Sequence, residues 1–134
     1  MAEKIRVNVE KIELEVNDNG DTIILPVSDE RFIQRLYDFS KNVQQKAEEI
    51  GYIDKNNIEA LVDADIALHE YIKDEFKGLF GDGSYEKVFG EDIVVGAEYV
   101  LEFINQCTPF IQNYLEKRNK KLSKYSADRT GSSL

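Results

Sequence analysis

Alternating apolar and polar positions predict strands at the start of the chain. Apolar side chains take every second place in residues 5–9 and again in residues 12–16, with charged or amide side chains between them. A period of two is typical of a strand with one buried face. The apolar parity changes from odd to even between Val9 and Ile12. This change indicates either a bulge or a tight turn near residues 10–11.

The next segment predicts a hairpin. Residues 17–21 read Asn-Asp-Asn-Gly-Asp, which are residue types that tolerate the positive φ of tight turns. Thr22–Leu25 is rich in strand-forming residues, and Pro26 ends or edges that strand because it has no N–H to donate. We expect two or three antiparallel strands within about residues 4–26. So few strands need a helix packed against them.

Three later segments have apolar residues at helical spacing, and they predict helices over about residues 29–50, 55–79 and 92–118. Ser28 is a candidate cap for the first helix. The third helix has the broadest apolar face, which suggests burial on two sides or a surface for a partner. Pro109 lies inside it and predicts a kink.

Residues 76–91, between the second and third helices, contain four glycines and four aromatic residues. Glycines interrupt a helix, whereas the neighbouring apolar side chains are unfavourable in water. This composition predicts a packed corner. We expect Phe80 and Phe89 to be largely buried, and a short helical turn to begin at Tyr85.

The predicted fold class is α+β. A single domain over residues 1–118 would consist of a small N-terminal antiparallel β-hairpin or three-stranded sheet followed by a three-helix bundle. Apolar residues become scarce from Asn119 onward, so residues 119–134 are expected to form a disordered, flexible basic tail. The net charge of the chain is -9, of which residues 118–134 carry +4 and the first 117 residues carry -13.

The composition argues against catalysis and against several kinds of partner. The chain has one histidine, His69, and one cysteine, Cys107, which lies on an apolar helical face. Neither residue has the neighbours that a metal site or an activated nucleophile needs, so we expect no enzyme activity, no cofactor and no metal. The acidic body argues against nucleic-acid and membrane partners. No signal-peptide pattern or membrane-length apolar run is present, so a soluble protein that is not exported is expected.

Four features of the chain together resemble a known family. They are the strand region Ile5–Leu25, the helix start Ser28–Phe32, the corner Leu79–Gly90, and Lys124–Arg129 near the end. With these features the chain resembles the tail assembly chaperones of long-tailed phages and prophages of Gram-positive bacteria. The resemblance implies a non-enzymatic protein of the host cytoplasm that binds the tape measure protein and tail-tube subunits. It also implies that a longer product can arise by ribosomal frameshifting.

On this interpretation, the candidate partner-binding residues form a face of the third helix together with two anchors in the tail. They are Val100, Phe103, Phe110 and Tyr114 on the helix, and Tyr125 and Arg129 in the tail. Two other functions stay open: a structural virion component, such as a tail or head-completion protein, and a host-directed binding or regulatory protein. Assembly of the chain into a homo-oligomer also stays open.

Overall fold

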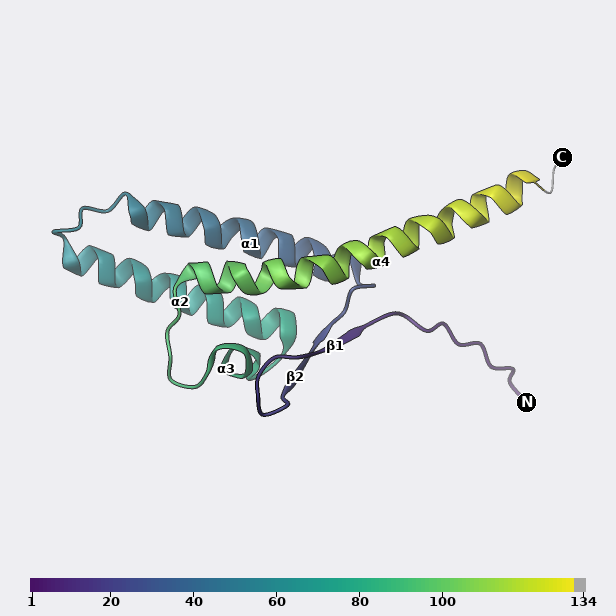
Figure 1. Cartoon of the computed structure of the whole chain (residues 1–134), viewed down its shortest axis with the longest axis horizontal. Coiled ribbons are helices and arrows are strands. Elements are labelled where there is room, and N and C mark those ends of the chain that lie inside the picture. The colour runs from purple at the N-terminus through teal and green to yellow at the C-terminus, as the bar shows by residue number, and fades with distance from the viewer. Residues whose placement is uncertain (132–134) are drawn as a thin grey trace.

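The computed structural model describes the backbone of residues 1–131 and the side chains of residues 1–126. It confirms the α+β class, with a two-stranded sheet followed by helices (Figure 1). The elements are β1 (Ile12–Glu15), β2 (Thr22–Leu25), α1 (Glu30–Gly51), α2 (Ile58–Phe80), α3 (Ser84–Phe89) and α4 (Ala97–Gly131).

The N-terminal sheet is a hairpin. Strands β1 and β2 pair antiparallel, from Ile12 opposite Leu25 to Glu15 opposite Thr22. The turn between them is fixed by Asn17, whose side-chain oxygen accepts hydrogen bonds from the backbone N–H groups of Asn19 and Asp21 at 2.9 and 3.2 Å. Of the two predicted alternatives, a hairpin and a three-stranded sheet, the structure has the hairpin, because residues 1–10 have no regular secondary structure.

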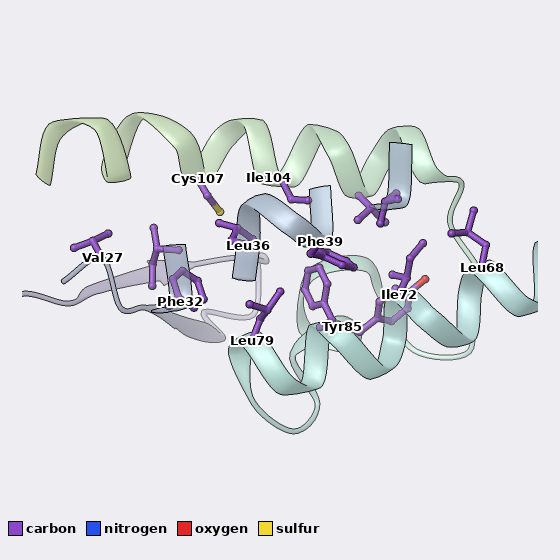
Figure 2. Close-up of a cluster of buried hydrophobic side chains, with 14 residues drawn as sticks. Val27, Phe32, Leu36, Phe39, Leu68, Ile72, Leu79, Tyr85, Ile104 and Cys107 are labelled. Atoms are coloured by element: carbon purple, nitrogen blue, oxygen red, sulfur yellow. The ribbon is translucent and has the colours of Figure 1, made fainter. Parts of the chain in front are cut away.

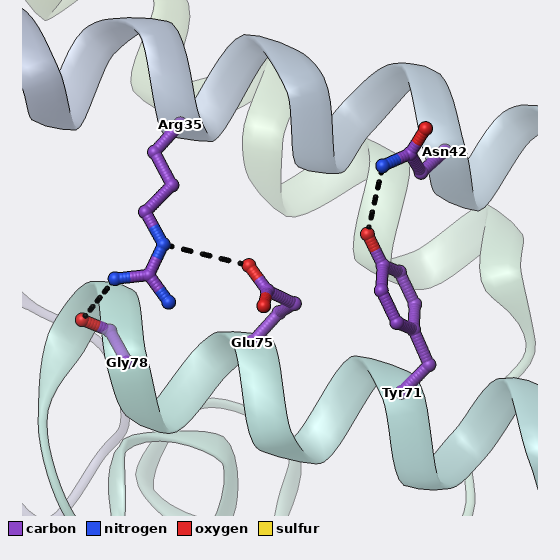
Figure 3. A network of polar contacts seen from close by, with 5 residues as sticks. All are labelled: Arg35, Asn42, Tyr71, Glu75 and Gly78. Carbon is purple, nitrogen blue, oxygen red and sulfur yellow. Dashed lines mark hydrogen bonds and ion pairs between the residues drawn. The ribbon is translucent and has the colours of Figure 1, made fainter.

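Helices α1 and α2 lie side by side and are joined by polar contacts along their exposed edge (Figure 3). The Arg35 guanidinium donates to the backbone carbonyl of Gly78 at 3.2 Å and lies 3.6 Å from a carboxylate oxygen of Glu75. Further along, the Asn42 side chain donates to the Tyr71 hydroxyl at 3.1 Å. These contacts are half-exposed, so they orient the two helices more than they stabilise them.

The first two helices begin and end close to their predicted positions. The N-cap of α1 is Asp29 and not Ser28, since the Asp29 carboxylate accepts from the N–H groups of the first turn. Asn57 caps α2 in the same manner. Both are short polar side chains that satisfy N–H groups left free at a helix start.

Helix α4 differs from the third predicted helix at both ends. It begins at Ala97 instead of residue 92, because residues 91–96 form a loop in which Asp92 has a φ of +54°. At the other end it continues to Gly131, so the flexible tail expected from residue 119 is helical as far as the description reaches. Lysine, arginine and leucine are good helix formers, and they sustain the helix where apolar residues are scarce. The part of the tail prediction that concerns residues 132–134 lies outside the described residues.

Proline inside α4 accompanies a change of direction. Pro109 cannot donate to the carbonyl one turn earlier, and the hydroxyl of the preceding Thr108 donates to the Ile104 carbonyl at 3.1 Å. Figure 1 shows the helix bending away from the bundle along its length.

The hydrophobic core lies where α1, α2 and α4 meet, with β2 and Val27 closing one end (Figure 2). Phe76 of α2 is at its centre, with no exposed surface. Five other aromatic rings lie within 5.0–6.2 Å of the Phe76 ring, between centroids: Phe39, Phe80, Tyr85, Phe89 and Phe103.

The glycine-rich corner is packed, as its composition predicts. Its short helix, α3, begins at Ser84, one residue before the expected Tyr85. Tyr85 is only 3% exposed, and its hydroxyl accepts from the Val95 N–H at 3.2 Å and donates to the Ile93 carbonyl at 3.3 Å. Phe80 and Phe89 keep only partial exposure, as expected of largely buried rings, and both belong to the cluster around Phe76.

One glycine of the corner has a backbone conformation that other residues rarely adopt. Gly83 has a φ of +74°, and it is the residue that precedes α3. We expect Gly83→Ala to lower the free energy of unfolding by about 1–2 kcal/mol, because a Cβ is strained in the left-handed region. Urea denaturation measures this. Gly51→Ala is the matched control: it lies at the end of α1 with open space around it, and should be neutral or slightly stabilising.

Candidate functional site

A groove runs between one face of α4, the β1 hairpin and the loop that joins α3 to α4. Its volume is about 800 Å³. We call it the α4 groove. It is lined by Leu14, Glu15, Val16, Val88, Phe89, Ile93, Val94, Val95, Gly96, Tyr99, Glu102, Phe103, Gln106, Cys107 and Phe110.

Helical spacing builds one wall of the groove. Tyr99, Phe103, Gln106 and Phe110 follow one another at intervals of three or four residues, so their side chains lie along one side of α4. The opposite wall comes from the hairpin and from the loop at residues 93–96. The groove therefore depends on segments that are far apart in the sequence.

Specific hydrogen bonds hold the hairpin and the loop in place. The Asn17 side chain donates to the Lys87 carbonyl of α3 at 2.9 Å, and the Lys87 ammonium donates to the Thr22 carbonyl at 3.4 Å. The loop is held by its two hydrogen bonds to the Tyr85 hydroxyl. These contacts tie both parts of the second wall, the hairpin and the loop, to the packed corner.

The chemistry of the groove suits an apolar segment with polar or basic flanks. Several of its apolar side chains are open to solvent, with Phe110 40%, Tyr99 54% and Val94 66% exposed. Glu15, Glu102 and Gln106 supply polar groups beside them, two of them acidic. Exposed apolar side chains gathered around one concave surface are typical of binding sites for peptides or helices.

The structure brings two of the predicted site residues together. Phe103 and Phe110 both line the groove. Tyr114 is half-buried against the core, and Tyr125 is 68% exposed on the extension of α4, away from the groove. The side chain of Arg129 lies outside the described part of the chain.

The assignment of Val100 to a partner face is wrong. Val100 has no exposed surface and belongs to the core, together with Ile104 and Cys107 of the same helix. Since α4 packs against α1, the side of α4 that carries these three residues is covered. The open side of the helix is rotated toward Tyr99 and Phe110.

Sequence reasoning missed Ile93, Val94 and Tyr99 as site residues. Val94 fitted the inner face of a helix that was expected to begin at residue 92, whereas in the structure it lies in a loop. Tyr99 lies one turn before Phe103, and that spacing is the signal that could have placed it beside Phe103 and Phe110.

Reactive side chains contribute little chemistry to the groove. Burial raises the pKa of the Cys107 thiol to about 12, so the thiol stays protonated at neutral pH and is a poor nucleophile. His69 is half-buried, with its ring edge-on to Tyr85 at 5.5 Å between centroids. Within the described residues, no three His, Cys, Asp or Glu side chains are grouped so that they could hold a metal ion. In the same part of the chain, no helix is both long and apolar enough to cross a membrane.

Comparison with known proteins identifies a family but no characterised relative. No curated protein and no solved structure matches the chain. A family model described as a family of unknown function, DUF6673, matches residues 19–132, which include strand β2 and all four helices but not strand β1. The match covers most of the chain, and the protein therefore belongs to the DUF6673 family.

Proposed function

We propose that this protein is a non-enzymatic chaperone of phage tail assembly, which binds the tape measure protein and tail-tube subunits in the host cytoplasm. The observation that carries the proposal is the α4 groove, an open and mainly apolar groove of about 800 Å³ whose second wall is held in place by a packed corner. A chaperone for an elongated helical protein needs such a surface in order to cover apolar helix faces before assembly.

The charge distribution supports the same role. The whole chain carries -9, which favours solubility of a complex that contains an aggregation-prone partner. Two carboxylates at the groove, Glu15 and Glu102, would favour a segment that has basic residues beside its apolar ones. The resemblance to tail assembly chaperones implies that this partner is the tape measure protein.

Co-expression with the tape measure protein of the same phage or prophage tests the proposal. We expect the tape measure protein to move from the insoluble to the soluble fraction, and to be retained on a column through a tag on this chain. Mass spectrometry of finished particles should not detect the chain. Its presence in particles would instead identify a structural virion component, and normal tails in a deletion strain would favour a host-directed role.

A further inference from the structure

The first residues of the chain form an extended arm that has a strand pattern but no neighbouring strand. We define the N-terminal arm as residues 3–11. Within the described part of the chain, no backbone hydrogen bond involves residues 3–9. Its alternate apolar side chains are open to solvent, with Ile5 91%, Val7 83% and Val9 62% exposed. In Figure 1 the arm runs away from the body of the molecule.

The base of the arm, in contrast, is fixed to the turn before α1 and to α4. The Ser28 hydroxyl donates to the Glu10 carbonyl at 2.6 Å, and the Lys117 ammonium lies 3.5 Å from a carboxylate oxygen of Glu10. The arm therefore leaves the molecule from a defined point and in an extended form. Backbone N–H and C=O groups arranged in this way are a template for pairing with another strand.

We propose that the N-terminal arm pairs antiparallel with the arm of a second copy of this chain, about a two-fold axis at Val7. The sequence is self-complementary in this register. The axis sets Val7 opposite Val7, Ile5 opposite Val9, and Arg6 opposite Asn8. It also places opposite charges across from each other at the two outer pairs: Lys4 faces Glu10, and Glu3 faces Lys11. Apolar and opposite-charge pairs directly across a ladder stabilise it, whereas like charges destabilise it.

The contacts at the base of the arm are compatible with this pairing. When Val7 and its copy form a hydrogen-bonded pair, residues 5 and 9 do so as well, and the backbone groups of residues 4, 6, 8 and 10 point outward. The outward carbonyl of Glu10 can then keep its hydrogen bond from Ser28. The Glu10 carboxylate is exposed enough to meet Lys4 of the second copy as well as Lys117.

The symmetry of the proposal gives a sharp cross-linking test on the full-length chain. Val7→Cys places two cysteines opposite each other with Cα atoms about 5.5 Å apart, which suits a disulfide. In the same register the two cysteines of Asn8→Cys lie roughly 8 Å apart, which is too far for a disulfide. Under mild oxidation, the first variant should become a covalent dimer at least about tenfold faster than the second. The native Cys107 is 1% exposed and should not compete.

Sedimentation equilibrium of the uncross-linked chain provides the second test. The wild-type chain should show a reversible monomer–dimer equilibrium. Glu3→Lys should raise its dissociation constant several-fold, because it sets like charges opposite each other twice per dimer, and Glu3→Lys combined with Lys11→Glu should restore it. In the described part of the chain, neither side chain forms a hydrogen bond or an ion pair with the helices, so circular dichroism should be unchanged.

Three results would overturn the proposal. They are a wild-type chain that stays monomeric at its highest soluble concentration, equal cross-linking of the two cysteine variants, and a dimer that the charge reversal leaves unaffected. Each would mean that the arms do not meet in this register. The tail-assembly proposal does not depend on the outcome.

Discussion

Phe76→Ala should destabilise the protein by about 3–5 kcal/mol, the usual cost of removing a buried phenylalanine ring. Phe76 has no exposed surface, and the five rings around it come from α1, α2, α3 and α4. Because these neighbours belong to different elements, they cannot close the cavity by a local shift. A domain of this size is typically stable by about 5–15 kcal/mol, so the loss would be a large share.

Urea denaturation followed by circular dichroism measures this effect. Phe110→Ala removes the same side chain from a position that is 40% exposed, and should cost about 1 kcal/mol or less. Equal losses for the two variants would show that the ring cluster around Phe76 is not the centre of the stability of the fold.

Tyr99→Asp combined with Phe110→Asp should weaken binding to the tape measure protein by more than about 100-fold. Both side chains line the α4 groove, and Tyr99 is 54% and Phe110 40% exposed; neither belongs to the core, so the charges disturb the groove without entering the core. An aspartate in an apolar contact has to lose its hydration when a partner covers it, and the two existing carboxylates of the groove increase the repulsion.

The matched control for the groove is Tyr37→Asp combined with Tyr52→Asp. These two aromatic side chains are 63% and 90% exposed and do not line the groove. Their replacement adds the same charge to the protein and should leave the affinity within about twofold of wild type. Isothermal titration of the purified tape measure protein, or of its soluble segments, compares the two double variants. If the groove variant binds like wild type while the control variant does not, the partner surface lies elsewhere.

The sequence predicts an element well when its apolar residues form a single stripe, and less well when its packing depends on other elements. Helix α1 has one narrow apolar stripe, from Phe32 to Ile50, and its predicted and observed ends differ by one residue. Helix α4 carries apolar residues around much of its circumference, so the pattern could not decide which stripe faces α1. Val100 was placed on the wrong side for that reason.

Other differences have equally local causes. Residues 119–131 have few apolar residues but contain strong helix formers, and the helix continues from a segment that is already formed. Residues 5–9 have the alternation of a strand, yet a strand requires a neighbour, and residues 1–131 provide none for them. Only the α4 wall of the groove could be predicted, because the second wall comes from a hairpin and a loop that the periodicity of α4 cannot reveal.

The extension of α4 has an electrostatic consequence. From Arg118, which pairs with Glu30 at 2.7 Å, the helix runs on to Gly131, a length of about 20 Å. Ions at physiological strength screen charge over about 8 Å. Lys124 lies about 9 Å beyond Arg118 along the helix axis, so the acidic body neutralises it only weakly, whereas Lys120 and Lys121 lie within about 5 Å of Arg118. Lys120, Lys121 and Lys124 are all exposed there. The molecule thus presents an acidic body and a basic helix extension: salt should weaken attraction to the extension while leaving contacts in the apolar groove largely intact.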